Sequence, residues 1–199
     1  MPQDAAPPGR RERNKREKLD RIVAAASQLL AEHSIEDVTT AQVAALADIG
    51  TGTLFLYAKT KGELLLLVQN AQYEAALAAG IKAAQNSATA AEAVLAIIAP
   101  IVECNRHQVS NGRYYLREML FGDHEEPHHR EALTIAAQTE VALAQAVQRH
   151  GALAEEQAAT TAHILSAVMF LAMAATPNAH LSADEILNQI SDQLHVLLP

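Results

Sequence analysis

The segment Thr39–Leu65, TTAQVAALADIGTGTLFLYAKTKGELL, contains two short runs with helical apolar spacing. A short Asp-Ile-Gly sequence at positions 48–50 separates the runs, and a turn that carries two lysines ends the second. In the first run Val43, Ala44 and Ala47 lie on one predicted face, and they are small enough for another helix to approach closely. The segment therefore predicts two short packed helices joined by a tight turn.

The residues between the two runs suit such a turn. Ile49 is apolar and is predicted to fill the corner, whereas Asp48 and Gly50 tolerate unusual backbone angles. Leu54 and Phe55 are predicted to form the inward face of the second helix. This is the pattern of a helix-turn-helix, whose second helix enters the major groove of DNA.

The composition favours an all-α fold. Half of the 199 residues are apolar, only 4% are aromatic and none is Trp, and Ala and Leu dominate the apolar set. The single cysteine, Cys104, excludes an internal disulfide. The N-terminus is charged where a signal peptide is apolar, and the longest apolar run, Ile164–Ala175, is shorter than the roughly 20 residues that cross a bilayer. We therefore expect a cytoplasmic protein without a membrane span.

Charge is distributed unevenly along the chain. Residues 1–64 carry nine Lys/Arg and nine Asp/Glu, whereas residues 65–199 carry six and fourteen, so the second part accounts for the net charge of −8. Within the first part, seven cations cluster at positions 10–21 against three acidic side chains. A basic cluster of this kind suits phosphates. A solvated tail is an equally good reading of the charged run taken alone.

The order of helices follows from caps and breakers. We expect a flexible basic arm over residues 1–17, order from about Lys18, and an amphipathic first helix that ends near His33. Four later starts show the Ser/Thr-x-x-Glu/Gln pattern, in which side chains satisfy the free N–H groups of a first turn. These pairs are Thr39/Gln42, Thr60/Glu63, Thr89/Glu92 and Ser182/Glu185.

The second half is predicted to continue as helices without strands. The helix from Lys61 is expected to run towards Gln85, and the helix over residues 90–109 to kink or break at Pro100. Asn111-Gly112 is expected to end that helix, and Gly122 to close a short helix over residues 114–121. A polar loop then leads to helices over residues 127–150, with Gly151 as C-cap, 155–175 and 182–198.

A family resemblance becomes specific at residues 47–65, ADIGTGTLFLYAKTKGELL. This segment resembles the DNA-binding segment of TetR-family transcriptional regulators, whose pattern reads roughly A-G-V-S-x-G-T-L-Y-x-Y-F-x-S-K-E-x-L. The upstream RIVAAASQLLAEHSIEDVTTAQVA also looks like the first two helices of that family, so the similarity covers about residues 18–67. It implies a nine-helix architecture with a DNA-binding domain at residues 18–62 and an effector-binding and dimerisation domain at residues 63–199.

Four positions depart from the family pattern. Asp48 replaces the usual glycine, Gly50 the usual serine cap, and Phe55 a tyrosine whose hydroxyl reaches a phosphate. Ala58 replaces a core aromatic, so neighbouring side chains must rebuild the local packing. These changes leave the predicted fold intact and alter the expected details of DNA contact.

The resemblance implies a set of DNA-binding residues. Hydroxyls, a helix N-terminus and an ammonium group suit phosphate oxygens, so Thr39 or Thr40, with Thr53, Tyr57 and Lys61, are the expected phosphate contacts. Thr51, Gly52 and Leu56 are the candidates for base edges, and Leu56 is limited to apolar contact such as a thymine methyl. The alternative is that these are surface or packing positions without DNA contact. The implied partner is an operator with an inverted repeat.

The resemblance also implies a small-molecule effector, of unidentified nature, bound among the fourth to seventh helices. Polar groups among apolar ones there form the candidate set Cys104, His107, Tyr114, Tyr115, Arg117, Glu118, Met119, Phe121, Met169, Phe170 and Met173. Each also has an ordinary explanation as a solvated or core residue. The broad apolar faces within Ile164–Ala175 and Ile186–Leu198 predict a homodimer through the last two helices, with burial inside one subunit as the alternative.

Catalytic and metal chemistry find little support in the sequence. His124 and His128 stand at helical spacing beside acidic residues, but Pro127 interrupts that spacing, so we expect a solvated loop and no metal or cofactor. Cys104 and His107 lack a partner acid, and no phosphate-binding glycine loop or nucleophile elbow appears. We therefore expect a transcriptional regulator that is not an enzyme. An architectural protein that binds other proteins is the main rival.

Overall fold

The computed structural model describes residues 9–150 and 153–198, and these ranges contain nine α-helices, two short 3₁₀ turns and no strand. The prediction of an all-α fold is confirmed. The helices are α1 (Arg10–Glu32), α2 (Thr40–Leu46), α3 (Thr51–Leu54), α4 (Lys61–Ala83), α5 (Ala90–Arg106), α6 (Val109–Phe121), α7 (Pro127–His150), α8 (Glu155–Ala174) and α9 (Ala183–Leu197).

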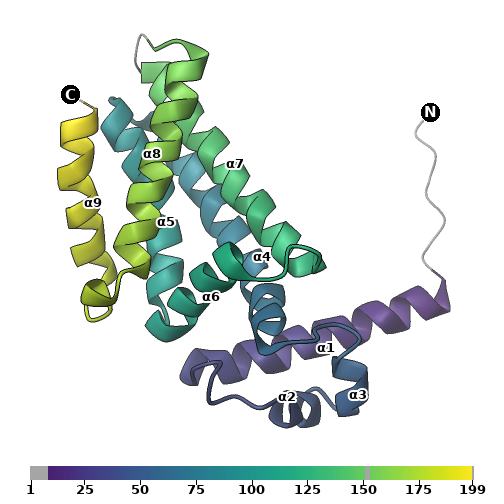
Figure 1. Ribbon diagram of the computed structural model, residues 1–199. Coiled ribbons are helices and arrows are strands. Elements are labelled where there is room, and N and C mark those ends of the chain that lie inside the picture. Colours follow the sequence, from purple (N-terminus) through teal and green to yellow (C-terminus); the bar gives the residue numbers. More distant parts are fainter. Residues whose placement is uncertain (1–8, 151–152, 199) are drawn as a thin grey trace, which may run out of the picture.

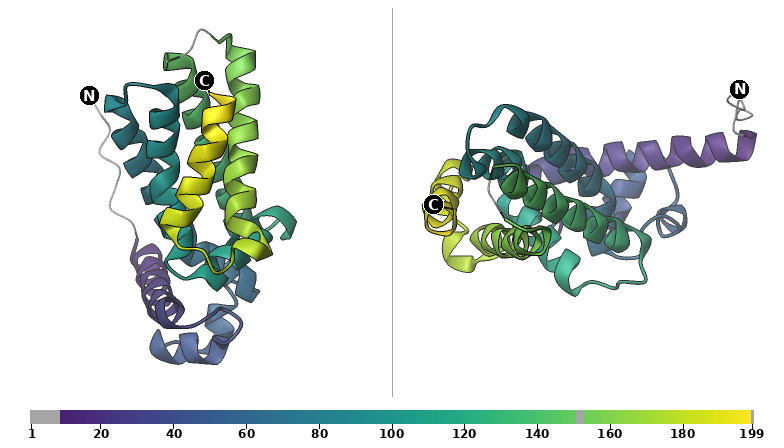
Figure 2. Two further views of the ribbon diagram at one scale, coloured as in Figure 1. Left: turned by 90° about the vertical axis from the view of Figure 1, so that its left-hand side faces the viewer. Right: turned by 90° about the horizontal axis from the view of Figure 1, so that it is seen from above.

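The helices form a small N-terminal unit and a larger bundle. Figure 1 shows α1, α2 and α3 gathered at one end of the molecule, with α4 rising from them into the bundle of α5 to α9. Within the bundle α4 packs on α5 and α7, and α8 packs on α7 and α9. Figure 2 shows α9 lying along α8 on the outside of the bundle. Because α4 crosses the boundary expected at residues 62–63, one continuous helix belongs to both parts.

All four predicted N-terminal caps are present. The side chains of Thr39, Thr60, Thr89 and Ser182 each accept a hydrogen bond from the backbone N–H three residues later. Thr39 and Ser182 form complete capping boxes, in which the Gln42 or Glu185 side chain accepts from the cap backbone in return. These motifs are local, so the sequence determines them within four residues.

The first helix begins earlier than expected. It starts at Arg10 rather than near Lys18, so residues 10–17 are helical and not a flexible arm. Arg, Lys and Glu dominate this stretch, and all three are good helix formers that extend an existing amphipathic helix at little cost. In Figures 1 and 2 these turns project beyond the rest of the molecule. Residues 1–8 lie outside the described residues.

The boundary between α5 and α6 was also predicted wrongly. Helix α5 ends at Arg106, and α6 begins at Val109 with Gln108 as its N-cap, so Asn111 and Gly112 lie inside α6 rather than ending a helix. The side chain of Asn111 bonds to a distant backbone, and a Cβ on Gly112 would collide with the carbonyl of Asn105. Tertiary contacts therefore override the usual helix-ending meaning of Asn-Gly. Helix α5 continues through Pro100 without a break.

The remaining helix boundaries agree with expectation. Gly122 closes α6, Pro127 starts α7, and α8 and α9 lie within one residue of their predicted limits. The C-cap proposed at Gly151 lies outside the described residues.

By length and apolar composition α8 would be able to cross a membrane, which is weak evidence because core helices pass the same test. Here α8 packs against α7 and α9.

Candidate nucleic-acid interface and ligand cavities

The turn between α2 and α3 is built as the sequence predicted, except at Gly50. Asp48 has φ of 53°, the left-handed conformation that Asp tolerates, and Arg21 Nη1 lies 3.3 Å from both its carbonyl and its carboxylate. Ile49 packs partly buried against the core. Gly50 has φ of −71° and ψ of 144°, which any residue adopts, so no special backbone freedom is used there. Arg21 thus pairs with the negative charge that Asp48 adds beside this surface.

One face of the segment after this turn is open to solvent. Leu56 is 84% exposed, and Thr51 and Gly52 are exposed as well, so the three candidates for base contact lie on the surface. Leu54 is buried as predicted. Phe55, however, is 44% exposed, so the prediction that it faces inward is wrong. Helix α3 ends at Leu54, and the following turn carries Phe55 out of the buried stripe.

The expected phosphate contacts flank this face, and several also fix the local structure. Tyr57 Oη donates to Lys15 O at 3.2 Å, and Lys61 Nζ donates to Glu36 O at 2.8 Å. The hydroxyl of Thr39 is engaged with Gln42, while Thr40 and Thr53 are partly buried. The ammonium of Lys61 has three donors, so its bond to Glu36 leaves capacity for a phosphate oxygen.

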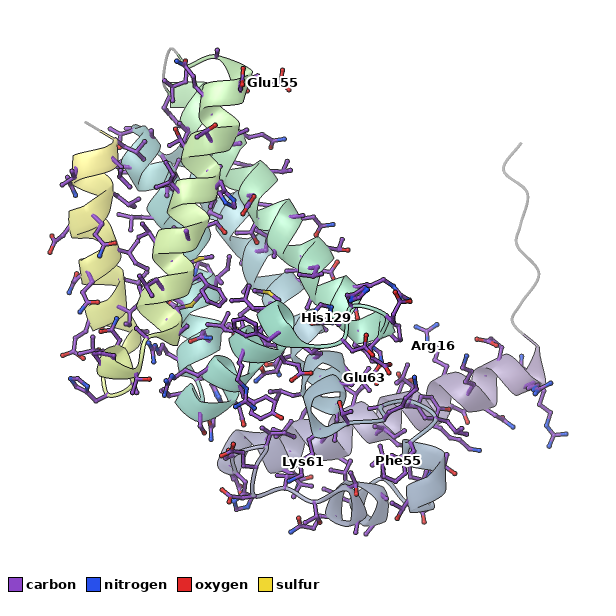
Figure 3. All side chains as sticks on the ribbon, in the orientation of Figure 1. Arg16, Phe55, Lys61, Glu63, His129 and Glu155 are labelled. Carbon is purple, nitrogen blue, oxygen red and sulfur yellow. The ribbon has the colours of Figure 1, made fainter. Side chains whose placement is uncertain are left out.

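The projecting turns of α1 add positive charge close to Tyr57. Arg10, Arg11, Arg13, Lys15, Arg16 and Lys18 are all exposed. Figure 3 shows Arg16 on this projecting part, while Phe55 and Lys61 lie on the compact part of the N-terminal unit. Because Tyr57 bonds to Lys15, the basic turns are connected to the turn that follows α3. The arrangement forms an exposed, basic surface that is open to a large anionic partner.

The candidate ligand residues do not form one site. Tyr115, Met119, Met169, Phe170 and Met173 help to line a small cavity of about 60 Å³ between α4, α5, α6, α7 and α8, which we call the enclosed cavity because most of its lining side chains are buried. Tyr114, Arg117 and Phe121 line an open cleft of about 410 Å³, which also reaches Phe170. Cys104 and His107 line a third hollow, against α1 and α4. The sequence analysis grouped these residues because they lie in neighbouring predicted helices, but the fold distributes them among three hollows.

A chain of buried polar groups runs beside the enclosed cavity. The rings of Tyr73 and Tyr115 stack with centroids 4.2 Å apart, and Tyr73 Oη accepts from Asn105 Nδ2. Tyr115 Oη donates to Asn70 Oδ1 at 2.9 Å. Asn70 Nδ2 in turn donates to His128 O and to Glu131, both at 2.9 Å. The sequence analysis did not identify Asn70, Tyr73 or Asn105 as site residues. The only signal for them in the sequence is a polar residue on an otherwise buried helix face.

Burial decides the chemistry of the ionisable groups near this cavity. Desolvation raises the pKa of the Cys104 thiol to about 11, so at neutral pH the sulfur remains a thiol rather than the reactive thiolate. Burial also raises the pKa of Tyr73 and of Tyr115, so both hydroxyls keep their protons as hydrogen-bond donors. The cavity walls therefore present neutral polar groups among apolar ones.

Besides the continuous helix α4, two sets of hydrogen bonds among the described residues connect the N-terminal unit to the bundle, and the first is neutral. Asn111 on α6 is fully buried. Its Nδ2 donates to Leu30 O and His33 O at 3.0 Å, and its Oδ1 accepts from Ile35 N at 2.7 Å. The Asn111 side chain thus supplies hydrogen-bond partners for backbone groups at the carboxyl end of α1 and in the loop after it. We call Asn111 and these three backbone partners the amide junction.

The second junction is charged and lies at the start of α4 and α7. Lys59 Nζ donates to Glu126 Oε1 at 2.8 Å, and Glu63 Oε2 accepts from Lys59 N at 3.1 Å. His128 Nε2 lies 3.2 Å from Tyr57 O, which accepts when that nitrogen carries the proton. We call Lys59, Glu63, Glu126 and His128 the charged junction. It joins the turn after α3 directly to the end of the Tyr115–Asn70 chain.

The histidines before and within α7 differ from the predicted solvated loop. His124 is exposed, but His128 is half-buried at the charged junction and His129 is only 4% exposed. In Figure 3 His129 lies near the start of α7 above Glu63. Within residues 9–150 and 153–198, no group of three His, Cys, Asp or Glu side chains is arranged to hold a metal.

The two apolar faces predicted to form a dimer are partly buried inside the single chain. Leu165, Ala172, Ile186, Ile190 and Leu194 are buried within the chain, as the alternative reading required. Other members of these faces remain available at the surface: Ile164 is 44% exposed, Leu171 67% and Leu197 38%.

Comparison with known proteins agrees with this geometry. Residues 22–68 match the sequence model of a family described as bacterial regulatory proteins, tetR family. The match begins in α1, includes α2, α3 and the exposed turn, and ends in α4. A search of curated proteins finds no match.

Solved structures extend the likeness to nearly the whole chain. A TetR transcriptional regulator from Rhodococcus sp. RHA1 aligns with a TM-score of 0.70 at 18% identity, covering 93% of this chain and 97% of the other. A TetR-family repressor, FadR from Thermus thermophilus, solved in complex with lauroyl-CoA, aligns with a TM-score of 0.69 at 16% identity, covering 90% and 92%. A regulator of the TetR/AcrR family from Thermobifida fusca has a TM-score of 0.63 at 17% identity, with 89% and 96% covered.

Proposed function

We propose that this chain, which has the DNA-binding segment and the overall fold of TetR-family transcriptional regulators, is a sequence-specific repressor released from its operator by a small molecule. The observation that carries the proposal is the position of the matched segment. It presents Thr51, Gly52 and Leu56 on an exposed face, beside Lys61 and the basic turns of α1. Such a face combines groups for base edges with cations for phosphates.

The contacts divide into two roles. Lys61, Tyr57 and the threonines at positions 39, 40 and 53 hold phosphates, so they fix the position of the protein on the duplex. Thr51, Gly52 and Leu56 meet base edges, where Leu56 favours an apolar group such as the thymine methyl. The helical basic turns at residues 10–18 add sequence-independent affinity that falls as salt rises.

Two copies of the chain act together in this proposal. The exposed Ile164 and Leu171 on α8, with Leu197 on α9, supply an apolar surface for a second copy. A two-fold dimer presents two recognition surfaces, so the operator is an inverted repeat. The double substitution Ile164→Glu and Leu171→Glu would place charges on that apolar surface without disturbing the buried core, and the double variant is expected to sediment as a folded monomer. If the double variant were still a folded dimer, this apolar surface would not be the dimer interface.

The enclosed cavity beside Tyr115 is the proposed effector site. Its volume of about 60 Å³ is well below the ~300 Å³ of ordinary ligand sites, so an effector must move the helices around it. Tyr115 leads through Asn70 to His128, and His128 contacts Tyr57 beside the DNA-binding face. An effector that favours the moved arrangement would therefore displace that face, and by reciprocity operator DNA would weaken effector binding.

The lauroyl-CoA complex of the Thermus thermophilus repressor supports regulation by a ligand in a protein of this fold. Catalysis by the same domain would need an activated group, and the raised pKa of Cys104 disfavours the most obvious nucleophile. We propose that the protein acts as a cytoplasmic regulator and not as an enzyme.

The test begins with selection of bound duplexes from a random library, using the full chain. An enriched inverted repeat is expected. Lys61→Ala should weaken binding to all duplexes and reduce the slope of affinity against salt, whereas Leu56→Ala should change the preferred sequence. Arg149→Ala, a change of an exposed cation far along α7, is the control. The absence of any enriched sequence, or a Lys61→Ala salt slope equal to that of the control, would contradict the proposal.

A further inference from the structure

The open cleft lies where the bundle meets the N-terminal unit. Ser34 and Glu36 of the loop between α1 and α2, Arg113 and Arg117 of α6, and Phe170 of α8 all line it. The cleft has a volume of about 410 Å³, within the range of small-molecule sites. An occupant would therefore touch both parts of the protein at once.

The charge on the α6 side of the cleft is positive. Arg113 Nε donates to Ala174 O at 3.1 Å and its Nη2 donates to Thr176 Oγ1 at 2.9 Å, so this guanidinium is held in place at the end of α8. Arg117 is exposed, with its guanidinium 4.2 Å from the centroid of the Tyr114 ring. Across the part of the chain that the structure describes, neither arginine forms an ion pair.

A third guanidinium lies behind this surface. Arg106 on α5 is buried, and its Nη2 donates to Ala172 O and Met173 O, while its Nε and Nη1 have no partner among the described residues. Burial, and after it the charge of Arg113, lowers the pKa of Arg106. The cluster thus concentrates positive charge in a low-dielectric region, where an anion would be strongly favoured.

Apart from Ser110, the remaining side chains that line the cleft are mainly apolar, and one of them borders the enclosed cavity. Leu120 is 50% exposed and Phe121 80% exposed on its rim. Phe170 lines both the cleft and the enclosed cavity beside Tyr115 and Met173. A single aromatic side chain therefore borders a site for a charged group on one side and a site for an apolar group on the other.

We propose that the effector is an amphipathic anion, whose head binds Arg113 and Arg117 in the cleft and whose apolar tail passes Phe170 towards the enclosed cavity. This inference rests on the proposed function and specifies the class of ligand. The head is a carboxylate or a phosphate ester, since both accept charge-assisted hydrogen bonds from guanidinium groups.

The same geometry gives the ligand a route to the DNA-binding face. The head lies beside Glu36, whose carbonyl accepts the hydrogen bond from Lys61 Nζ. An anion in the cleft repels the Glu36 carboxylate and moves the loop that holds Lys61. Binding therefore changes the position of a proposed phosphate contact without any change in α3 itself.

The test is calorimetric titration of the full chain with decanoate, decyl phosphate and the neutral decanol. Both anions are expected to bind at least about tenfold more tightly than decanol. Arg117→Gln should weaken the two anions by about tenfold and leave decanol unchanged. Arg149→Gln, the same change at an exposed site on α7, should alter none of the three.

A second variant examines the tail. Phe170→Ala should weaken decanoate but not hexanoate, because only the longer chain reaches past Phe170. Arg113 is left unchanged because it also holds the end of α8. Binding of one anion and not the other would support the proposal and identify the kind of head.

Three results would overturn the inference: decanol binding as tightly as the tighter of the two anions, equal anion affinities for the Arg117→Gln and Arg149→Gln proteins, or no binding of either anion to the native protein. Each leaves the proposed function standing if the protein still selects an inverted repeat. Conversely, tight Arg117-dependent anion binding without any selected duplex would support the cleft and overturn the role in transcription.

Discussion

The two junctions between the N-terminal unit and the bundle solve the same problem with opposite chemistry. At the amide junction one fully buried, neutral side chain, Asn111, makes three hydrogen bonds to backbone groups of α1 and its following loop. At the charged junction, Lys59 is largely exposed and pairs with Glu126 beside Glu63. The first contact is insensitive to pH and salt, while the second depends on both.

This difference indicates how movement would pass between the parts. The amide junction ties α6 to the end of α1, so these two helices should move together. The charged junction ties α7 to the turn after α3 through Lys59, whose side chain is exposed to water, and through the partly buried Glu126 and His128. A small change at α7 would therefore loosen the DNA-binding face while α1 and α6 stay joined. The variants below compare the two junctions, from the largest expected effect to the smallest.

Asn111→Ala should have the largest effect. It leaves the buried N–H of Ile35 and two carbonyls of the α1 end without their partner, and each such group costs about 1–3 kcal/mol. We expect a loss of about 3 kcal/mol in the free energy of unfolding, or roughly 6–12 °C in Tm for a chain of this size. Urea and thermal unfolding would measure it.

Asn188→Ala is the matched control, because Asn188 lies on α9 and is exposed. It should change the stability by less than about 0.5 kcal/mol. If Asn111→Ala were no more damaging than this control, the amide junction would not hold the two parts together.

Glu63→Gln should have a smaller effect on the free energy of unfolding, and it should stabilise the protein rather than destabilise it. Burial, and after it the hydrogen bond with Glu126, raises the pKa of Glu63. The folded protein therefore binds this proton more tightly than the unfolded chain, and stability is lost as pH rises from the ordinary Glu value through the raised one. Glutamine stays neutral, so the stability of the variant should gain on that of the native protein as pH rises from the ordinary Glu pKa of about 4.3 towards neutrality.

The measurement is the urea midpoint at several pH values, with Glu74→Gln, an exposed change on the same helix, as the control. A difference between native and Glu63→Gln proteins that is constant over this range would show that the Glu63 carboxyl does not titrate as the charged junction requires.

Glu126→Gln should be weaker still and should follow the reverse pH dependence. The hydrogen bond from Lys59 lowers the pKa of Glu126, so its stabilisation is present above the ordinary Glu value and is lost as pH falls through the lowered one. The variant should therefore be less stable than the native protein at pH 7, and the difference should vanish in acid. A variant as stable as the native protein at pH 7 would argue against the Lys59 contact.

The sequence predicted best what is decided locally. The caps at Thr39, Thr60, Thr89 and Ser182 each need one partner three residues away, and Asp48 adopts its positive φ within a single turn. The family pattern at residues 47–65 likewise lies in one continuous segment. For these features the determining interactions are close together in the chain, so local chemistry was sufficient.

The errors concern residues whose partners are remote in the sequence. Asn111 looked like a helix end, but its hydrogen-bond partners stand more than 70 positions away, in and after α1. His129 looked solvated, but it packs against Gly122 at the close of α6. The effector residues were collected by helix, whereas the direction of each side chain divides them among three hollows. Periodicity reports the face of a helix but not which neighbour covers it.

The smallest expected effect is a change with salt, and it separates the junctions most directly. At 1 M salt the screening length is about 3 Å, compared with about 10 Å at 0.1 M, so the exposed Lys59 gains less from Glu126. The stability difference between native and Glu126→Gln proteins should therefore shrink between 0.1 M and 1 M NaCl at pH 7. The difference for Asn111→Ala should stay constant, because its hydrogen bonds are buried and uncharged. Equal salt responses of the two differences would mean that the junctions do not differ in the way their chemistry requires.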